Sequence, residues 1–121
     1  MGSVNRVTLV GHLGNDAKVT KTTNGHLVGS FNMATNEVWK NKSGEKEQRT
    51  EWHRIVLWGQ QAESLSDYLK KGRQIYVEGR IQSSSWEKDD VKRTAVNIVA
   101  ETIKFLDSAK REDIDKKRHD L

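Results

Sequence analysis

One ten-residue stretch, EWHRIVLWGQ at 51–60, constrains the fold of this chain more than any other. Read as a β-strand, its side chains alternate between two opposite faces. Ile55 and Leu57 lie on one face, which is an ordinary core face. The other face carries Trp52, Arg54, Val56 and Trp58, with the two indoles on either side of the guanidinium. Two indoles beside a guanidinium suit stacking on flat, negatively charged polymers such as single-stranded nucleic acid, because every base has a π-face and every linkage a phosphate.

Other segments show the same two-residue period. The further predicted strands cover residues 4–13, 17–22, 26–39, 73–86 and 94–105, and the second of them is the weakest. Gly11 and Gly14 suggest a bulge or bend at a barrel corner. Asn24-Gly25 predicts a type I′ hairpin turn. Residues 40–50 contain no apolar side chain and predict a long charged loop.

Residues 61–72 change to a helical period. Ala62, Leu65 and Leu69 recur at helix spacing, and Gly72 suits the position just past the last turn. The predicted order is therefore strand, long strand, strand, helix, strand, strand, with glycines near the corners and no proline. This is an all-β fold with one short helix between the third and fourth strands, the plan of the five-stranded OB-fold barrel.

The composition excludes several classes of protein. At 121 residues the chain is a single domain. It has no cysteine, which excludes disulfide and thiolate metal sites, and its four histidines show no metal-ligand spacing. We therefore expect no metal and no cofactor, and no reaction-bearing motif points to an enzyme. No apolar run approaches a membrane span and no signal peptide begins the chain, so we expect no membrane partner and a cytoplasmic, nucleoid-associated protein.

The charge is unevenly distributed. Residues 107–121 carry equal numbers of acidic and basic side chains, so the net charge of +4 falls on residues 1–106. We therefore expect an OB-fold domain over 1–106 that carries the basic surface. We expect the charged tail over 107–121 to be a frayed helix or disordered.

The tryptophans are the most informative residues. Large aromatics are usually buried. However, Trp52, Trp58 and Trp86 fall on the polar faces of their predicted strands, with Arg54 and Arg80 as neighbours on those faces. The aliphatic residues already supply a full inner face without them. We therefore interpret the tryptophans as exposed stacking platforms. Trp39 does not fit, since alternation from Phe31 and Met33 places it inward.

Five parts of the chain together resemble one family. They are VNRVTLVGHLGND, FNMATNEVW, TEWHRIVLWG, YLKKGRQIYVEGRI and, later, Trp86. In this order and spacing, over about residues 4–106, they are similar to the bacterial-type single-stranded-DNA-binding protein. The resemblance implies a homotetramer of OB-folds that binds and protects single-stranded DNA without sequence preference during replication, recombination and repair.

The resemblance also implies which residues contact DNA. The family's stacking aromatics match Trp39, Trp52, Trp58 and Trp86, which implies a bulge that turns Trp39 outward. Basic positions that match family DNA contacts are Arg54 and Lys71. From their placement alone, we add Lys40, Lys42, Arg73 and Arg80. His53 lies opposite the tryptophans, and is either an ordinary core or surface histidine or, by resemblance, a residue near the subunit interface.

One departure from the family concerns the C-terminus. Bacterial members end in a flexible linker and an acidic tip that recruits replication and repair enzymes, whereas this sequence ends in KKRHDL. We therefore do not expect such recruitment, whether the chain is truncated or of a tail-less, mitochondrial-matrix type. Two other functions remain open, namely an RNA-binding OB-fold and a primosome-type protein-interaction module.

Overall fold

The computed structural model describes residues 2–106 and contains six strands with one short helix. The strands are β1 (Val7–Leu13), β2 (Lys18–Lys21), β3 (Leu27–Lys40), β4 (Lys46–Trp58), β5 (Gln74–Lys88) and β6 (Val91–Phe105). Helix α1 (Gln60–Leu65) and the single 3-10 turn η1 (Ser66–Tyr68) connect β4 to β5. With β2 as a short addition, this is the predicted five-stranded OB-fold with its helix between the third and fourth main strands. The tail predicted over 107–121 lies outside the described residues.

The sheet closes on itself through β1. The strand order is β1-β5-β6-β4-β3-β2, and β1 also pairs with β3. Strand β1 pairs with β5 from Val7 to His12 and with β3 at His12 and Leu13. This pairing closes the barrel over only part of β1, and the β4–β6 contact is the one parallel pairing among the described strands.

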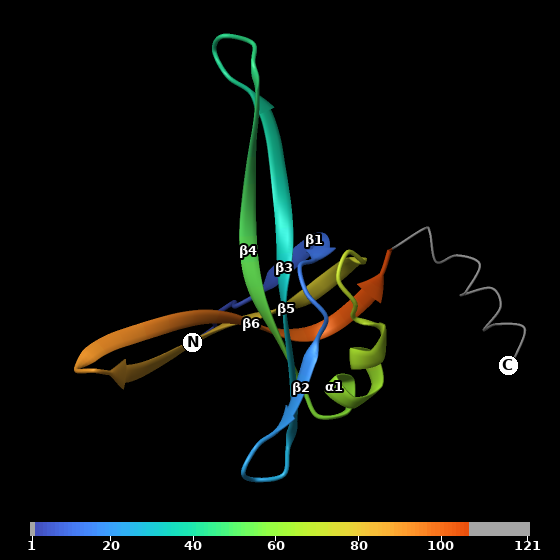
Figure 1. Cartoon of the computed structure of the whole chain (residues 1–121), viewed down its shortest axis with the longest axis vertical. Coiled ribbons are helices and arrows are strands. Elements are labelled where there is room, and N and C mark those ends of the chain that lie inside the picture. The colour runs from blue at the N-terminus through green and yellow to red at the C-terminus, as the bar shows by residue number, and fades with distance from the viewer. Residues whose placement is uncertain (1, 107–121) are drawn as a thin grey trace, which may run out of the picture.

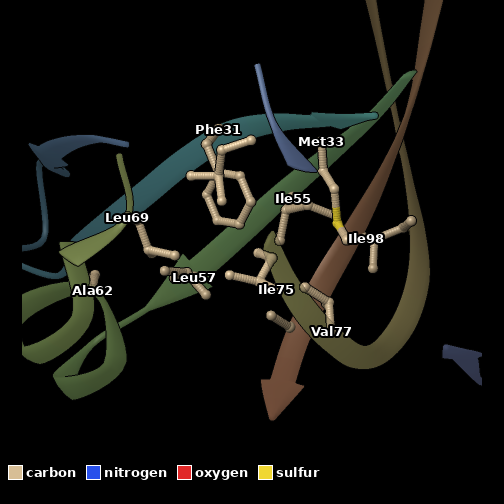
Figure 2. Packing of buried hydrophobic residues seen from close by; sticks show 11 residues of the cluster. Phe31, Met33, Ile55, Leu57, Ala62, Leu69, Ile75, Val77 and Ile98 are labelled. Carbon is tan, nitrogen blue, oxygen red and sulfur yellow. The ribbon is translucent and has the colours of Figure 1, made fainter. Parts of the chain in front are cut away.

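The core fills the inside of the barrel. Figure 2 shows side chains from β3, β4, β5 and β6 meeting those of α1 and the following turn. The largest fully buried side chains are Phe31, Met33, Ile55, Leu57, Leu69, Ile75 and Val77. Those that lie on strands come two residues apart, as Phe31 and Met33 on β3 or Ile55 and Leu57 on β4, which is the predicted two-residue period. Helix α1 covers one end of the barrel through buried Ala62.

Two long hairpins, β3–β4 and β5–β6, extend beyond the barrel (Figure 1). The predicted charged loop over 40–50 was wrong, because residues 36–40 pair with 46–50 as a ladder. Asn41 makes the short turn, since its Oδ1 accepts from the N–H groups of Ser43 and Glu45. A two-stranded ribbon in solvent has no buried face, so no hydrophobic alternation marks it in the sequence.

The extension of the β5–β6 hairpin beyond the barrel exposes two further apolar side chains. Ile81 has the parity of the inward Val77, and Val96 that of the inward Ile98, but both are exposed because the β5–β6 hairpin leaves the barrel there. The hairpin turns at Asp89 and Asp90, which both have positive φ. The Asn24-Gly25 hairpin is present, but only Gly25 has positive φ, so its turn is not type I′.

The helix is shorter than its sequence period predicted. After Leu65 the chain tightens into η1, and Ser66 Oγ donates to the carbonyl of Ala62. Lys70 and Lys71 therefore lie beyond the helix, in a turn that ends at Gly72 with φ +91°. Within residues 2–106, no helix is both long and apolar enough to cross a membrane.

Two glycines allow strands to approach closely. A Cβ at Gly11 would lie 2.1 Å from the carbonyl oxygen of Ala34, where β1 closes against β3. A Cβ at Gly79 would lie 2.1 Å from the carbonyl oxygen of Val99, beside the irregularity that shifts the β5–β6 register. Glycine is thus needed at position 11 because the close approach of β1 to β3 leaves no room for a side chain.

Gly79→Ala is expected to lower the free energy of unfolding by about 1–3 kcal/mol, the usual cost of forcing an extra group into a packed interior. Urea denaturation measures this change. Gly2→Ala is the control, since a Cβ there meets nothing within 4 Å. Equal midpoints for Gly79→Ala and the unchanged protein would contradict the close approach.

Candidate nucleic-acid interface

Strand register places three tryptophans on one face of the sheet. Trp52 and Trp58 alternate with the inward Ile55 and Leu57 along β4, so both face outward. Arg54 lies between them and pairs with Asn97 of β6, which in turn pairs with Gln82 of β5. Paired residues share a face, and Trp86 lies four residues beyond Gln82, on the same parity. The sheet's outer face, across β4, β6 and β5, therefore carries Trp52, Arg54, Trp58 and Trp86, and we call it the tryptophan face.

The indoles on this face are accessible. The exposed fractions of the four tryptophans lie between 42% and 59%, and Trp52 is the most exposed. Val56, predicted on the same face, does lie there, but it is buried between Ser30 and Val99 in the middle of the sheet. The face therefore carries exposed indoles, while its centre at Val56 is buried within the sheet.

Trp39 lies elsewhere, and the expected bulge was wrong. The β3–β4 register runs without a shift from Val28 opposite Trp58 to Lys40 opposite Lys46. Trp39 therefore keeps the parity of Phe31 and Met33. It is nevertheless exposed, because the hairpin has left the barrel at that point. Extension of the β3–β4 hairpin, which Figure 1 shows beyond the barrel, therefore accounts for the exposed indole without a change of face.

The predicted basic residues fall into separate places. Arg54 and Arg80 lie on the tryptophan face, where Arg80 pairs with Val99 of β6. Lys40 ends β3 and Lys42 follows in the turn, so both lie at the tip of the β3–β4 hairpin. Lys71 is exposed in the turn after η1, where its backbone N–H donates to Asp16 at 2.8 Å.

Arg73 has contacts of a different kind. Its guanidinium carbon lies 4.4 Å from the centre of the Phe105 ring, and Nη1 donates to the carbonyl of Tyr68 at 3.0 Å. Tyr68 in turn packs edge-on against Phe105. Arg73 thus connects the end of β6 to η1, which is a structural role, and we do not include it in the interface proposed below.

His53 faces the inner side of β4, opposite the tryptophans. Its Nε2 lies 2.9 Å from Oγ1 of Thr35, and the side chain is half-buried. The imidazole of His53 therefore has a hydrogen-bond partner within its own chain. Its place at a subunit interface stays a prediction.

A row of polar side chains on the tryptophan face, three amides and one guanidinium, was missed from the sequence. Asn32, Arg54, Asn97 and Gln82 are successive partners across β3, β4, β6 and β5. Among the described residues, Oδ1 of Asn97 is buried without a hydrogen-bond partner. The sequence signal was present, since Asn97 alternates with the inward Ile98. Only the register, however, places Asn97 beside Arg54.

A second polar cluster lies on β5, near its start and well before Trp86. The Tyr76 hydroxyl donates to Glu78 at 2.8 Å, and Glu78 also pairs with Arg6. The hydrogen bond to Glu78 raises the pKa of Tyr76 above its usual value, as do partial burial and the carboxylate charge. Over residues 2–106, no group of three or more potential metal-binding side chains occurs.

Arg73→Ala is expected to lower the free energy of unfolding by about 1–3 kcal/mol, through loss of the cation–π contact and the charged hydrogen bond. Its affinity for a single-stranded oligonucleotide should change less than twofold. Urea denaturation and anisotropy titration measure the two effects. Lys71→Ala is the matched control for stability. A large loss of affinity at unchanged stability would restore Arg73 to the interface.

Two relatives give the scale of similarity. The chain is 49% identical over 105 residues to "single-stranded DNA-binding protein 1" of Chlorobaculum tepidum, a match covering 85% of this chain and 65% of that protein. It is 46% identical over 105 residues to a single-stranded DNA-binding protein of Neisseria meningitidis serogroup A, a match covering 86% of this chain and 60% of that protein. The chain thus spans less than two thirds of the length of these relatives.

Solved structures agree with the fold. A Plasmodium falciparum SSB in complex with ssDNA superposes with a TM-score of 0.80 at 33% identity, over 88% of this chain and 98% of that one. A deletion mutant of the Thermus aquaticus single-stranded DNA binding protein superposes with a TM-score of 0.76 at 34% identity, over 88% of this chain and 52% of that one. The predicted OB-fold is confirmed. The model of the single-strand binding protein family matches residues 4–106, so this chain belongs to that family, whose members bind DNA and are not enzymes.

Proposed function

We propose that this protein binds single-stranded DNA without sequence preference and protects it during replication, recombination and repair. The observation that carries the proposal is the tryptophan face, where Trp52, Trp58 and Trp86 surround Arg54 outside a complete core. The Plasmodium falciparum relative in complex with ssDNA supports the same ligand for this chain. Trp39, at the outer part of the β3–β4 hairpin, is the fourth proposed platform.

Stacking supplies the part of the binding energy that does not depend on salt. A base on an aromatic ring contributes about 1–3 kcal/mol, so four platforms give a gross ~4–12 kcal/mol per subunit before ordering costs. Every base has a π-face, so stacking tolerates any sequence. Duplex DNA is disfavoured because its bases are already stacked on each other and its stiff backbone cannot follow separated rings.

Basic residues supply the part that depends on salt. We propose that Arg54 and Arg80 neutralise phosphates along the tryptophan face. Lys40, Lys42 and Lys71 contact the strand where it leaves that face. Each neutralised phosphate lowers log K by about 0.7 for a tenfold rise in salt concentration. Neither the stacking nor the phosphate contacts read base edges, which accounts for binding without sequence preference.

We also propose that the protein is a homotetramer. Within residues 2–106, β1 pairs with β5 on one edge but with β3 only at His12 and Leu13. The rest of its second edge is unpaired, and Val10 beside it is exposed. An unpaired strand edge is a ready template for another chain. Light scattering is expected to give four times the chain mass, and a monomeric mass would contradict the assembly.

The proposed cellular compartment rests on the source of the same relatives. Two of the similar proteins come from bacteria, which supports a cytoplasmic place for this protein, near the nucleoid.

The function is tested by titrating the protein with oligo(dT) at several salt concentrations while tryptophan fluorescence is recorded. Stacked indoles should be quenched, and log K should fall linearly with the logarithm of the salt concentration. An absence of quenching would contradict the proposal and favour a protein-interaction module. A matched oligo(rU) titration separates the remaining alternative, since tighter binding of RNA would indicate a reader of the 2′-OH.

Trp52→Ala is expected to weaken oligo(dT) binding by about 1–3 kcal/mol, the contribution of one stacked base. The free energy of unfolding should stay near that of the unchanged protein, because Trp52 is the most exposed of the tryptophans. Anisotropy titration and urea denaturation measure the two quantities. If the variant instead lost its fold in proportion to its binding, Trp52 would be a core residue.

A further inference from the structure

Gly14 lies directly against the Trp52 indole. A Cβ built on Gly14 would be 2.4 Å from Cζ3 and 2.9 Å from Cη2 of Trp52, both in the six-membered ring. Real Cβ atoms do not approach carbon this closely, so the ring occupies the space that a side chain at position 14 would fill. We propose that Gly14 is a positioning residue for the Trp52 stacking platform, an inference that rests on the proposed function.

The backbone does not require glycine at this position. Gly25, Gly44, Gly59 and Gly72 have positive φ, the left-handed region that favours glycine, whereas Gly14 does not. Any residue could adopt the conformation found at position 14. What only glycine provides here is room for the indole.

The segment that carries Gly14 is held on both sides and cannot move aside cheaply. The N–H of Gly14 donates to the carbonyl of Asn32 at 2.8 Å, and Oδ1 of Asn15 accepts from the N–H of Asn32 at 2.8 Å. The next residue, Asp16, accepts from the N–H of Lys71, also at 2.8 Å. These contacts fix the link between β1 and β2 against β3 and the turn after η1.

The indole is the part that gives way. It ends an exposed side chain that can rotate, and its cross-strand partner on β3 is the small Ala34, so little else holds it. A methyl group at position 14 would therefore move the ring and leave the barrel intact. Gly11 differs, because a Cβ there would meet the backbone oxygen of Ala34.

The position of the ring matters for the DNA. Trp52 must lie in line with Arg54 and Trp58 if one strand is to contact all three. A platform already resting in that place loses less rotamer freedom when a base stacks on it. Gly14 thus determines where the ring lies and how many rotamers it can adopt before DNA binds.

The test is a double-mutant cycle between positions 14 and 52, with labelled oligo(dT) followed by anisotropy. Gly14→Ala should weaken binding about 5-fold or more, the range for loss of a stacked base. Trp52→Phe lacks the outer ring atoms that a Cβ would meet, so adding Gly14→Ala to it should change affinity less than twofold. The control is Gly29→Ala, where a Cβ would make ordinary contacts at 3.4–3.8 Å.

Two results of the affinity measurements overturn the proposal. One is wild-type affinity in Gly14→Ala, and the other is an equal loss in the Trp52→Phe background, which would mean that Gly14 acts by another route. If Gly14→Ala does not fold, the double variant should recover the fold because the clash is gone. Failure of the double variant to recover the fold would also overturn the proposal.

A measurement without DNA separates this inference from the proposed function. In a protein whose other tryptophans are changed to phenylalanine, acrylamide should quench Trp52 more strongly after Gly14→Ala, because the ring leaves its place. Unchanged quenching contradicts the positioning role. If the unchanged protein fails to bind oligo(dT), the proposed function fails, and the acrylamide result still decides whether Gly14 positions Trp52.

Discussion

The register that joins β3, β4, β6 and β5 is the constraint on which the rest of this structure depends. Phe31 opposite Ile55, and Ile55 opposite Ile98, join the core across three strands. A slip of one residue would move every side chain of a strand to the opposite face. The apolar core therefore holds Trp52 and Arg54 outward without contacting them. The tryptophan face is, in this sense, placed by the residues on the other side of the sheet.

Barrel closure gives that surface its rigid support. Gly11 lets β1 approach β3, Gly79 lets β5 approach β6, and Gly14 leaves room for the ring of Trp52. All three act by the absence of a Cβ, two against backbone and one against an indole. Beyond the barrel the hairpins are ribbons without a core, so the residues there depend on hydrogen-bonded ladders and turns such as that at Asn41.

Much of the fold could be predicted from the sequence, because alternation is strong wherever one face of a strand is buried. The faces of Trp52, Arg54, Trp58 and Trp86 were predicted in this way. The prediction failed where burial stops. The strand over 46–50 shows no alternation, and Trp39 is exposed by extension and not by a bulge. The contact of Arg73 with Phe105 could not be predicted, because it joins parts of the chain that are distant in sequence.

The central claim is that single-stranded DNA runs along the tryptophan face of the barrel. Ultraviolet crosslinking to oligonucleotides that carry 5-iododeoxyuridine, followed by mass spectrometry of the peptides, tests it most directly. The account predicts adducts at Trp52, Trp58 and Trp86, with further adducts at Trp39 on the β3–β4 hairpin. Adducts concentrated on α1 or on the free edge of β1, with none on the tryptophan face, would contradict it.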